Sequence, residues 1–155
     1  MNILMILAVA FAGGTGACIR YIAVEGWPRL RAPAPTVAAN NGPTSAPPPA
    51  AARRLAPEWR LMIVNVLASL LAGFAAGLLP LPTVASMIVI SGFCGGLSSW
   101  SSVMLDAASA LSARKIGKAV IIVVVQMLWG VLAALIGVTV GQLLGESLGL
   151  GLLTW

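Results

Sequence analysis

Residues 92–102 read Gly-Phe-Cys-Gly-Gly-Leu-Ser-Ser-Trp-Ser-Ser and lie inside an otherwise apolar stretch that runs from Val84 to Leu111. Three glycines and four serines replace good helix formers in this run. The pattern predicts a helix that breaks near the middle of a membrane span. A break in lipid leaves backbone N–H and C=O groups without partners, at a cost of several kcal/mol each, so it must face protein or a water-filled path.

The composition indicates an integral membrane protein of the all-α class. Of 155 residues, 59% are hydrophobic and 8% are charged, and the mean hydropathy of +1.00 is far outside the range of soluble domains. A helix needs about 20 apolar residues to cross the hydrocarbon core of a bilayer. Four stretches meet this requirement, and we expect transmembrane helices at 3–24, 61–79, 84–111 and 119–144. We therefore predict one membrane domain of four helices, the third of them broken at mid-membrane.

The connections between these helices differ in length and composition. Residues 26–58 hold eight of the ten prolines, so we expect a disordered loop rich in Pro and Ala that acts as a tether. Only Pro80–Thr83 separates the second and third helices, which predicts antiparallel neighbours joined by a tight turn. Small residues four apart at Gly137, Gly141 and Gly145 predict a tightly packed face on the fourth helix.

The basic residues all fall on one side of the membrane when successive loops are assigned to alternate sides. They are Arg20, Arg29, Arg31, Arg53, Arg54, Arg60, Arg114, Lys115 and Lys118. Because loops rich in Lys and Arg stay in the cytoplasm, both termini of this multi-pass protein of the cell membrane are predicted to lie outside. An odd number of spans would place the two termini on opposite sides. The few cations lie beside hydrophobic segments, so topology explains them better than a nucleic-acid partner does.

No grouping of residues suited to catalysis emerges from the sequence. The chain has no His, and its acids are Glu25, Glu58, Asp106 and Glu146. Without a nucleophile beside a base, or a pair of carboxylates, we predict that the protein is not an enzyme. Cys18 and Cys94 lie in separate apolar segments, so we expect neither a disulfide nor a zinc site. A proton-coupled transporter would need a carboxylate at mid-membrane, and Asp106 is the sole candidate.

Uncharged hydrogen-bond donors are what the predicted spans offer instead. Asn65 and Ser69 lie one turn apart on the second helix, and the serines of the break follow on the third. An anion that crosses lipid needs its hydration replaced, and hydroxyl, amide and backbone N–H groups do this without trapping the ion as a fixed charge would. The plain alternative is that Ser and Gly pack helices and Asn65 bridges them. Arg20 and Asp106 have the alternative of reaching to the membrane interface.

The run from Gly95 to Val103, Gly-Gly-Leu-Ser-Ser-Trp-Ser-Ser-Val, resembles the Gly-Gly-Leu-Thr-Thr-Phe-Ser-Thr-Phe signature of the Fluc/CrcB family of fluoride channels. Residues 13–21, Gly-Gly-Thr-Gly-Ala-Cys-Ile-Arg-Tyr, are similar to the family's first-helix motif with its Gly-Gly, Gly-Ala and Arg-Tyr pairs. The family's second-helix motif is matched by Val64, Asn65, Ser69 and Gly73. Only the proline-rich loop and the C-terminal tail have no counterpart.

This resemblance implies a passive fluoride-export channel in the lipid bilayer, formed by an antiparallel dimer of four-helix subunits. It also implies two fluoride pores and a structural sodium ion at the dimer centre, held by backbone carbonyls that Gly95 and Ser98 match. Arg20 matches a vestibule arginine, and Asp106 matches an acid that follows the signature. The positions that match the ion pathway are Asn65, Ser69, Ser99, Trp100, Ser101, Ser102, Val103 and Gln126.

Several residues of this chain depart from the family pattern. Trp100 and Val103 stand where the signature has Phe, whose ring edges carry partial positive charge and contact fluoride. An indole edge can substitute for a phenyl edge, but an isopropyl group cannot. Gln126 and Gly130 stand where hydroxyl residues are common.

A homodimer of dual topology needs a weak charge bias, so we favour a heterodimer with an oppositely oriented paralogous subunit. The alternatives are a non-conducting scaffold subunit of such a heterodimer and, third, a small multidrug or proton-coupled transporter.

Overall fold

The computed structural model describes residues 2–26, 58–79, 81 and 83–148. Its helices are α1 (Ile3–Tyr21), α3 (Glu58–Leu78), α4 (Val84–Ser86), α5 (Gly95–Leu97), α6 (Trp100–Ser112) and α7 (Ile116–Ser147), with π-helical stretches η1 (Ile22–Gly26) and η3 (Met87–Cys94). The described residues contain no strand. Apart from its two end residues, the loop predicted at 26–58 lies outside the described residues.

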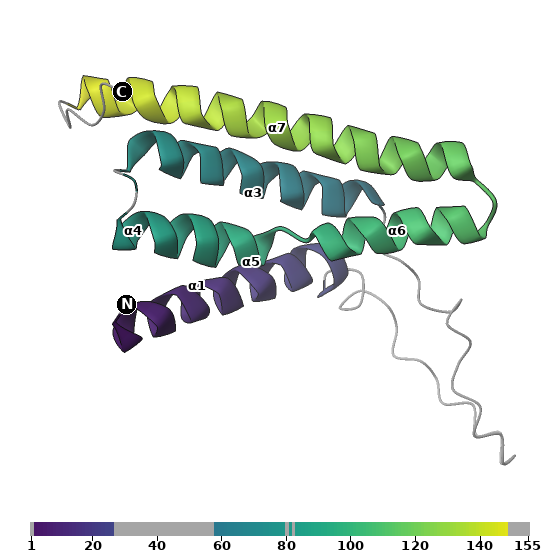
Figure 1. Ribbon diagram of the computed structural model, residues 1–155, viewed down its shortest axis with the longest axis horizontal. Coiled ribbons are helices and arrows are strands. Elements are labelled where there is room, and N and C mark those ends of the chain that lie inside the picture. The colour runs from purple at the N-terminus through teal and green to yellow at the C-terminus, as the bar shows by residue number, and fades with distance from the viewer. Residues whose placement is uncertain (1, 27–57, 80, 82, 149–155) are drawn as a thin grey trace, which may run out of the picture.

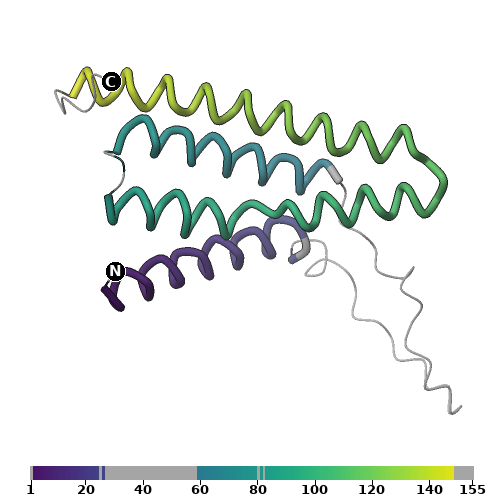
Figure 2. Tube along the Cα trace, in the orientation of Figure 1, coloured from purple at the N-terminus to yellow at the C-terminus, as the bar shows by residue number. Residues whose placement is uncertain are grey.

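The described part of the chain forms four helical spans that are long and apolar enough to cross a bilayer. They cover Ile3–Val24, Trp59–Leu78, Val84–Ser112 and Ile116–Ser147, which confirms the predicted all-α fold with four membrane-length helices. Successive spans run in opposite directions, so α3 and α7 run the same way and α1 and α6 run the other way (Figure 1). The trace in Figure 2 follows the same path, with the N-terminal and C-terminal ends at one end of the bundle and the α6–α7 turn at the other.

Glycines let α3 and α7 approach each other closely. A Cβ built on Gly137 or Gly141 would overlap backbone carbonyl oxygens of α3, and one built on Gly73 would overlap the carbonyl oxygen of Ala134. Small residues at a helix crossing allow this backbone approach. The tightly packed face predicted for the fourth helix is therefore confirmed at Gly137 and Gly141. A Cβ at Gly145 would make only ordinary van der Waals contacts.

A second glycine crossing joins α1 to the first half of the third span. A Cβ on Gly16 would overlap the carbonyl oxygen of Phe93, and one on Gly96 would overlap the carbonyl oxygen of Gly13. These contacts fix the position of α5 against α1. Beside this crossing, a buried cluster packs α3, η1 and α5 together, with Phe93 against its edge; its members are Val24, Val64, Ala68 and Leu97.

Candidate functional site

The third span is interrupted at two residues. Helix α5 ends at Leu97, Ser98 and Ser99 have extended backbones (φ −81°, ψ 154° and φ −146°, ψ 101°), and α6 begins at Trp100. In an unbroken helix, the N–H of Ser99 would donate to the carbonyl oxygen of Gly95. The interruption frees these backbone groups at the place where the sequence is richest in glycine and serine. Its depth in a bilayer stays a prediction.

Asn65 of α3 meets the backbone of the break. The Ser99 N–H donates to Asn65 Oδ1 at 2.9 Å, and Asn65 Nδ2 donates to the Ser99 carbonyl oxygen at 3.4 Å. Both residues are buried. A buried backbone N–H or C=O needs a partner, and one amide side chain here serves both groups of a single residue. Asn65 thus bridges the second span to the third, which was the plain alternative raised from the sequence.

The serine hydroxyls gather on the α6 side of the break. Ser99 Oγ accepts a hydrogen bond from the Ser102 N–H at 3.3 Å, so Ser99 caps the N-terminus of α6. The Ser99 and Ser102 hydroxyls lie 2.8 Å apart, and those of Ser99 and Ser101 lie 3.3 Å apart. The structure therefore brings these three predicted pathway residues into one cluster of hydroxyl groups beside Asn65.

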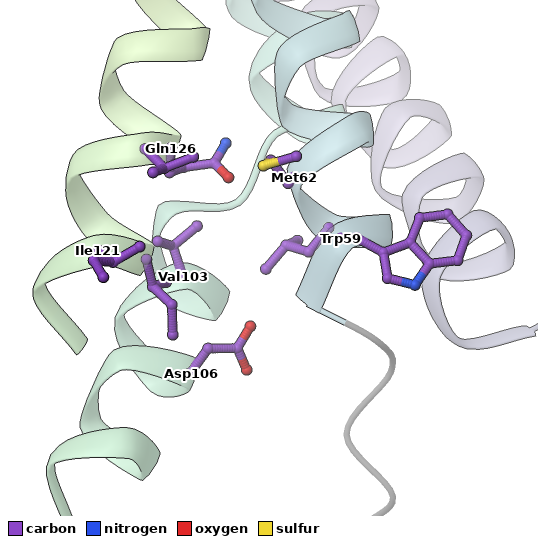
Figure 3. Close-up of a pocket in the computed structure, with 9 residues that line it drawn as sticks. Trp59, Met62, Val103, Asp106, Ile121 and Gln126 are labelled. Carbon is purple, nitrogen blue, oxygen red and sulfur yellow. The ribbon is translucent and has the colours of Figure 1, made fainter. Parts of the chain in front are cut away.

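A cavity of about 210 Å³ lies between α3, α6 and α7. It is lined by Trp59, Leu61, Met62, Val103, Asp106, Ile121, Ile122, Val125 and Gln126. Figure 3 shows the Gln126 amide and the Asp106 carboxylate pointing into the space between the helices, whereas the Trp59 ring points away from it. Gln126 is 8% exposed and Val103 is 1% exposed, so a polar and an aliphatic side chain share the buried wall of this cavity. An ion in it would contact few polar atoms.

Other predicted site residues lie apart from the cavity. Trp100 is half exposed at the start of α6 and does not line the cavity with Val103. Ser69 lies next to Gly130 of α7, where a built Cβ would be 3.5 Å from the Ser69 hydroxyl. Arg20 lies in the last turn of α1, and its buried Nε has no hydrogen-bond partner among the described residues.

The sequence did not predict the aliphatic part of the cavity wall. Met62, Ile121, Ile122 and Val125 line it, although each looks like a lipid-facing residue in the sequence. Apolar side chains that face lipid and those that face a cavity have the same composition. No signal in a single sequence separates them.

The chemistry of the break also fits a hard monovalent cation. Since Ser99 N–H donates to Asn65, the Gly95 carbonyl lacks its usual helical donor and accepts a hydrogen bond from the Ser98 hydroxyl at 3.5 Å. Gly95 and Ser98 are both exposed residues in one chain. Carbonyl oxygens are ligands suited to alkali cations. Among the described residues, no group of three or more His, Cys, Asp or Glu side chains offers another metal site.

Four membrane-length helices, with uncharged hydrogen-bond donors at a break in the third, define a multi-pass α-helical membrane protein. A family model described as CrcB-like protein, Camphor Resistance (CrcB), matches residues 7–138. The chain belongs to this family, which confirms the predicted resemblance and agrees with the prediction that it is not an enzyme.

Two named relatives match different shares of the chain. The Fluoride-specific ion channel FluC 2 of Synechococcus sp. (strain CC9902) is 39% identical over 91 residues, which are 57% of this chain and 67% of that protein. The Fluoride-specific ion channel FluC 1 of Nitrobacter hamburgensis (strain DSM 10229 / NCIMB 13809 / X14) is 27% identical over 143 residues, which are 90% of this chain and 96% of that protein. The second alignment therefore spans nearly the whole of both proteins.

Proposed function

We propose that this chain is a subunit of a fluoride channel that lets the anion leave the cytoplasm down its own gradient. The observation that carries the proposal is the cluster of uncharged donors at the break, where Asn65, Ser99, Ser101 and Ser102 meet. Fluoride holds its water tightly, so a path through lipid needs hydrogen-bond donors that replace this water. Family membership and the names of both relatives support the same function.

The pathway we propose runs from the hydroxyl cluster along the cavity wall. On this wall Gln126 supplies an amide donor from α7, and outside the cavity Ser69 supplies a hydroxyl further along α3. These groups are neutral, so binding at each is weak enough for the ion to move on. The Asp106 carboxylate would repel an anion in the cavity unless positive charge balances it. The basic residues at the nearby end of the bundle can supply this positive charge.

The dimer, its sodium ion and its orientation belong to the same proposal. Among the described residues of one chain, Gly95 and Ser98 offer carbonyl oxygens at the break, and a cation there would need further oxygens from a second subunit that approaches it. A sodium ion would neutralise the negative C-terminal end of α5, which stops at the break in each subunit. The described cations Arg20, Arg60, Arg114, Lys115 and Lys118 lie at the end of the bundle opposite the termini, which supports a cytoplasmic place for that end (Figure 1).

Val103 favours a second candidate, a non-conducting scaffold subunit in a heterodimer. Its isopropyl group is almost fully buried in the cavity wall and offers neither a hydroxyl nor an aromatic ring edge. Such a subunit would contribute carbonyls to the sodium ion while its partner's pore conducts. The third candidate, a proton-coupled exchanger, requires that transport depend on Asp106 and follow the pH gradient.

Fluoride efflux from liposomes separates these candidates. The protein is reconstituted alone, and then with an oppositely biased subunit of the same family, and chloride efflux is the control. Selective fluoride efflux with the chain alone establishes a self-sufficient channel and rules out an obligatory partner. Efflux that appears only with the partner supports the heterodimer. No fluoride efflux from folded protein in either case contradicts the proposed function.

A further inference from the structure

The amide of Asn65 makes two hydrogen bonds to a single backbone residue. Its Oδ1 accepts the Ser99 N–H at 2.9 Å, and its Nδ2 donates to the Ser99 carbonyl oxygen at 3.4 Å. The Asn65 amide therefore bonds both the N–H and the C=O of Ser99. A residue in an antiparallel sheet bonds its partner on the neighbouring strand in the same way. Asn65 is 6% exposed and Ser99 is 9% exposed, so protein shields both bonds. The Asn65 amide thus bonds to the protein backbone, whereas a side chain that simply lines a pore would face the ion.

We propose that Asn65 is a positioning residue, which holds the break open at Ser99 and thereby sets the orientation of the Ser99 and Ser102 hydroxyls. The bond to Oδ1 diverts the Ser99 N–H from the Gly95 carbonyl, which would otherwise extend α5 by one residue. Ser99 is then free to cap α6 through its hydroxyl. The proposal rests on the fluoride-channel function only for its effect on transport.

Three helices are connected by this chain of hydrogen bonds. It starts at Asn65 on α3, crosses to the backbone of Ser99 after α5, and continues from Ser99 Oγ to the N–H and hydroxyl of Ser102 in α6. Removal of the Asn65 amide leaves two buried backbone groups without partners. The Ser99 N–H can then return to the Gly95 carbonyl, and Ser99 no longer stands at the cap position. The Ser102 N–H loses its acceptor in that event.

Residue-resolved hydrogen exchange in lipid nanodiscs tests the positioning role directly. We expect Asn65→Ala to speed exchange of the Ser102 amide about tenfold, because the partly buried hydrogen bond from this amide to Ser99 Oγ is lost. Asn65→Asp keeps an oxygen that can accept the Ser99 N–H, so its Ser102 amide should exchange at close to the unmodified rate. Ile63→Ala, at an exposed position on the same helix, is the matched control. Amides of the α3–α7 crossing report that each variant is folded. Unchanged Ser102 exchange in folded Asn65→Ala overturns the proposal.

A double-mutant cycle on fluoride efflux tests whether Asn65 acts through Ser99. Ser99→Ala removes the capping hydroxyl and leaves the backbone bonds to Asn65 in place. We expect each single variant to slow efflux about tenfold and the double variant to be at most about twofold slower than the worse single one, since both interrupt the same chain. If the effects of the two substitutions on the efflux rate multiply in the double variant, Asn65 acts as an independent ligand of the ion. That result would overturn the proposal. If the unmodified protein carries no fluoride, the proposed function fails, and the exchange experiment still decides the role of Asn65.

Discussion

Asn65 and Gln126 carry the same amide group but stand in different surroundings. Asn65 bonds to the backbone at the break, whereas Gln126 projects from α7 into the cavity and forms no side-chain hydrogen bond with the described residues. A buried amide without a protein partner is costly unless water or an ion meets it. Gln126 is therefore the side chain on the cavity wall best placed to contact a permeating anion.

Replacement of this amide by an aliphatic group should block the pathway without disturbing the fold. We expect Gln126→Leu to lower fluoride efflux from liposomes at least about tenfold, the worth of one hydrogen bond to the ion, and to leave the resistance to unfolding unchanged or higher. Met127→Leu is the control, because Met127 is the next residue on α7 and is exposed. Equal efflux from both variants would place the pathway outside the cavity.

At the scale of helices, the two glycine crossings decide which faces meet. The α3–α7 crossing is sensitive to added volume, since a Cβ on Gly137 would overlap the carbonyl oxygen of Leu70, which cannot move independently of its helix. Gly14 of α1 is the contrasting case, because a Cβ there has no neighbour within 4 Å. The same substitution should thus have opposite effects at the two positions.

We expect Gly137→Ala to destabilise the protein by about 1–3 kcal/mol, because the added methyl group forces α3 and α7 apart. Gly14→Ala should be neutral or slightly stabilising, since Ala favours a helix more than Gly does. Titration with a denaturing detergent, followed by circular dichroism, measures both. A Gly137→Ala variant as stable as the unmodified protein would contradict the packing described for these helices.

The turn between α6 and α7 places a charged residue where glycine is favoured. Arg114 has a φ of 58°, and the bonds from Arg114 N–H to the Leu111 carbonyl and from Lys115 N–H to the Ala110 carbonyl, both 2.9 Å, form a Schellman motif. Arg114→Gly should therefore stabilise the protein by about 1 kcal/mol by relieving the left-handed conformation. Lys115→Gly removes the same charge at a negative φ and should destabilise it in the same detergent titration. A gain of stability in both variants would point to charge repulsion in place of backbone strain.

The molecule as a whole presents most of its apolar surface to its surroundings. Only 6% of the most apolar window of the first span is buried, against 39% for the second. A soluble monomer does not expose such a surface, so lipid or another subunit must cover α1. The arrangement of the helices also separates the described cations from both described chain ends (Figure 1).

Accessibility of single cysteines in intact cells tests the predicted orientation. In a background of Cys18→Ser and Cys94→Ala, we expect Ser147→Cys to react with a membrane-impermeant thiol reagent from outside. Gly117→Cys, at the cationic end, should react only after permeabilisation, because cytoplasmic loops retain the positive charge. Substantial labelling of both positions in intact cells would show dual topology and remove the charge argument for a heterodimer.

Some of the site followed from the sequence because local chemistry dictates it. A run of Gly and Ser inside an apolar span disfavours a continuous helix, and the interruption falls at Ser98 and Ser99 within the predicted run. The cavity did not follow, because lining by Met62 and Ile121 depends on which way α3 and α7 are rotated. Trp100 was grouped with Val103 from the motif, yet the start of α6 turns the indole outward and Val103 inward.

The sequence by itself determined that the chain forms four apolar helices, that the third contains a weak point, and that the cations among the described residues gather at one end. Hydrophobicity, helix propensity and charge are local properties, so the amino-acid sequence alone is enough to predict their effects. Only the tertiary structure decided that Asn65 bonds to Ser99, 34 positions away, and that Gln126 and Val103 share one cavity wall. These pairings depend on close approach across the glycine crossings, which brings distant residues together through packing of the complete bundle.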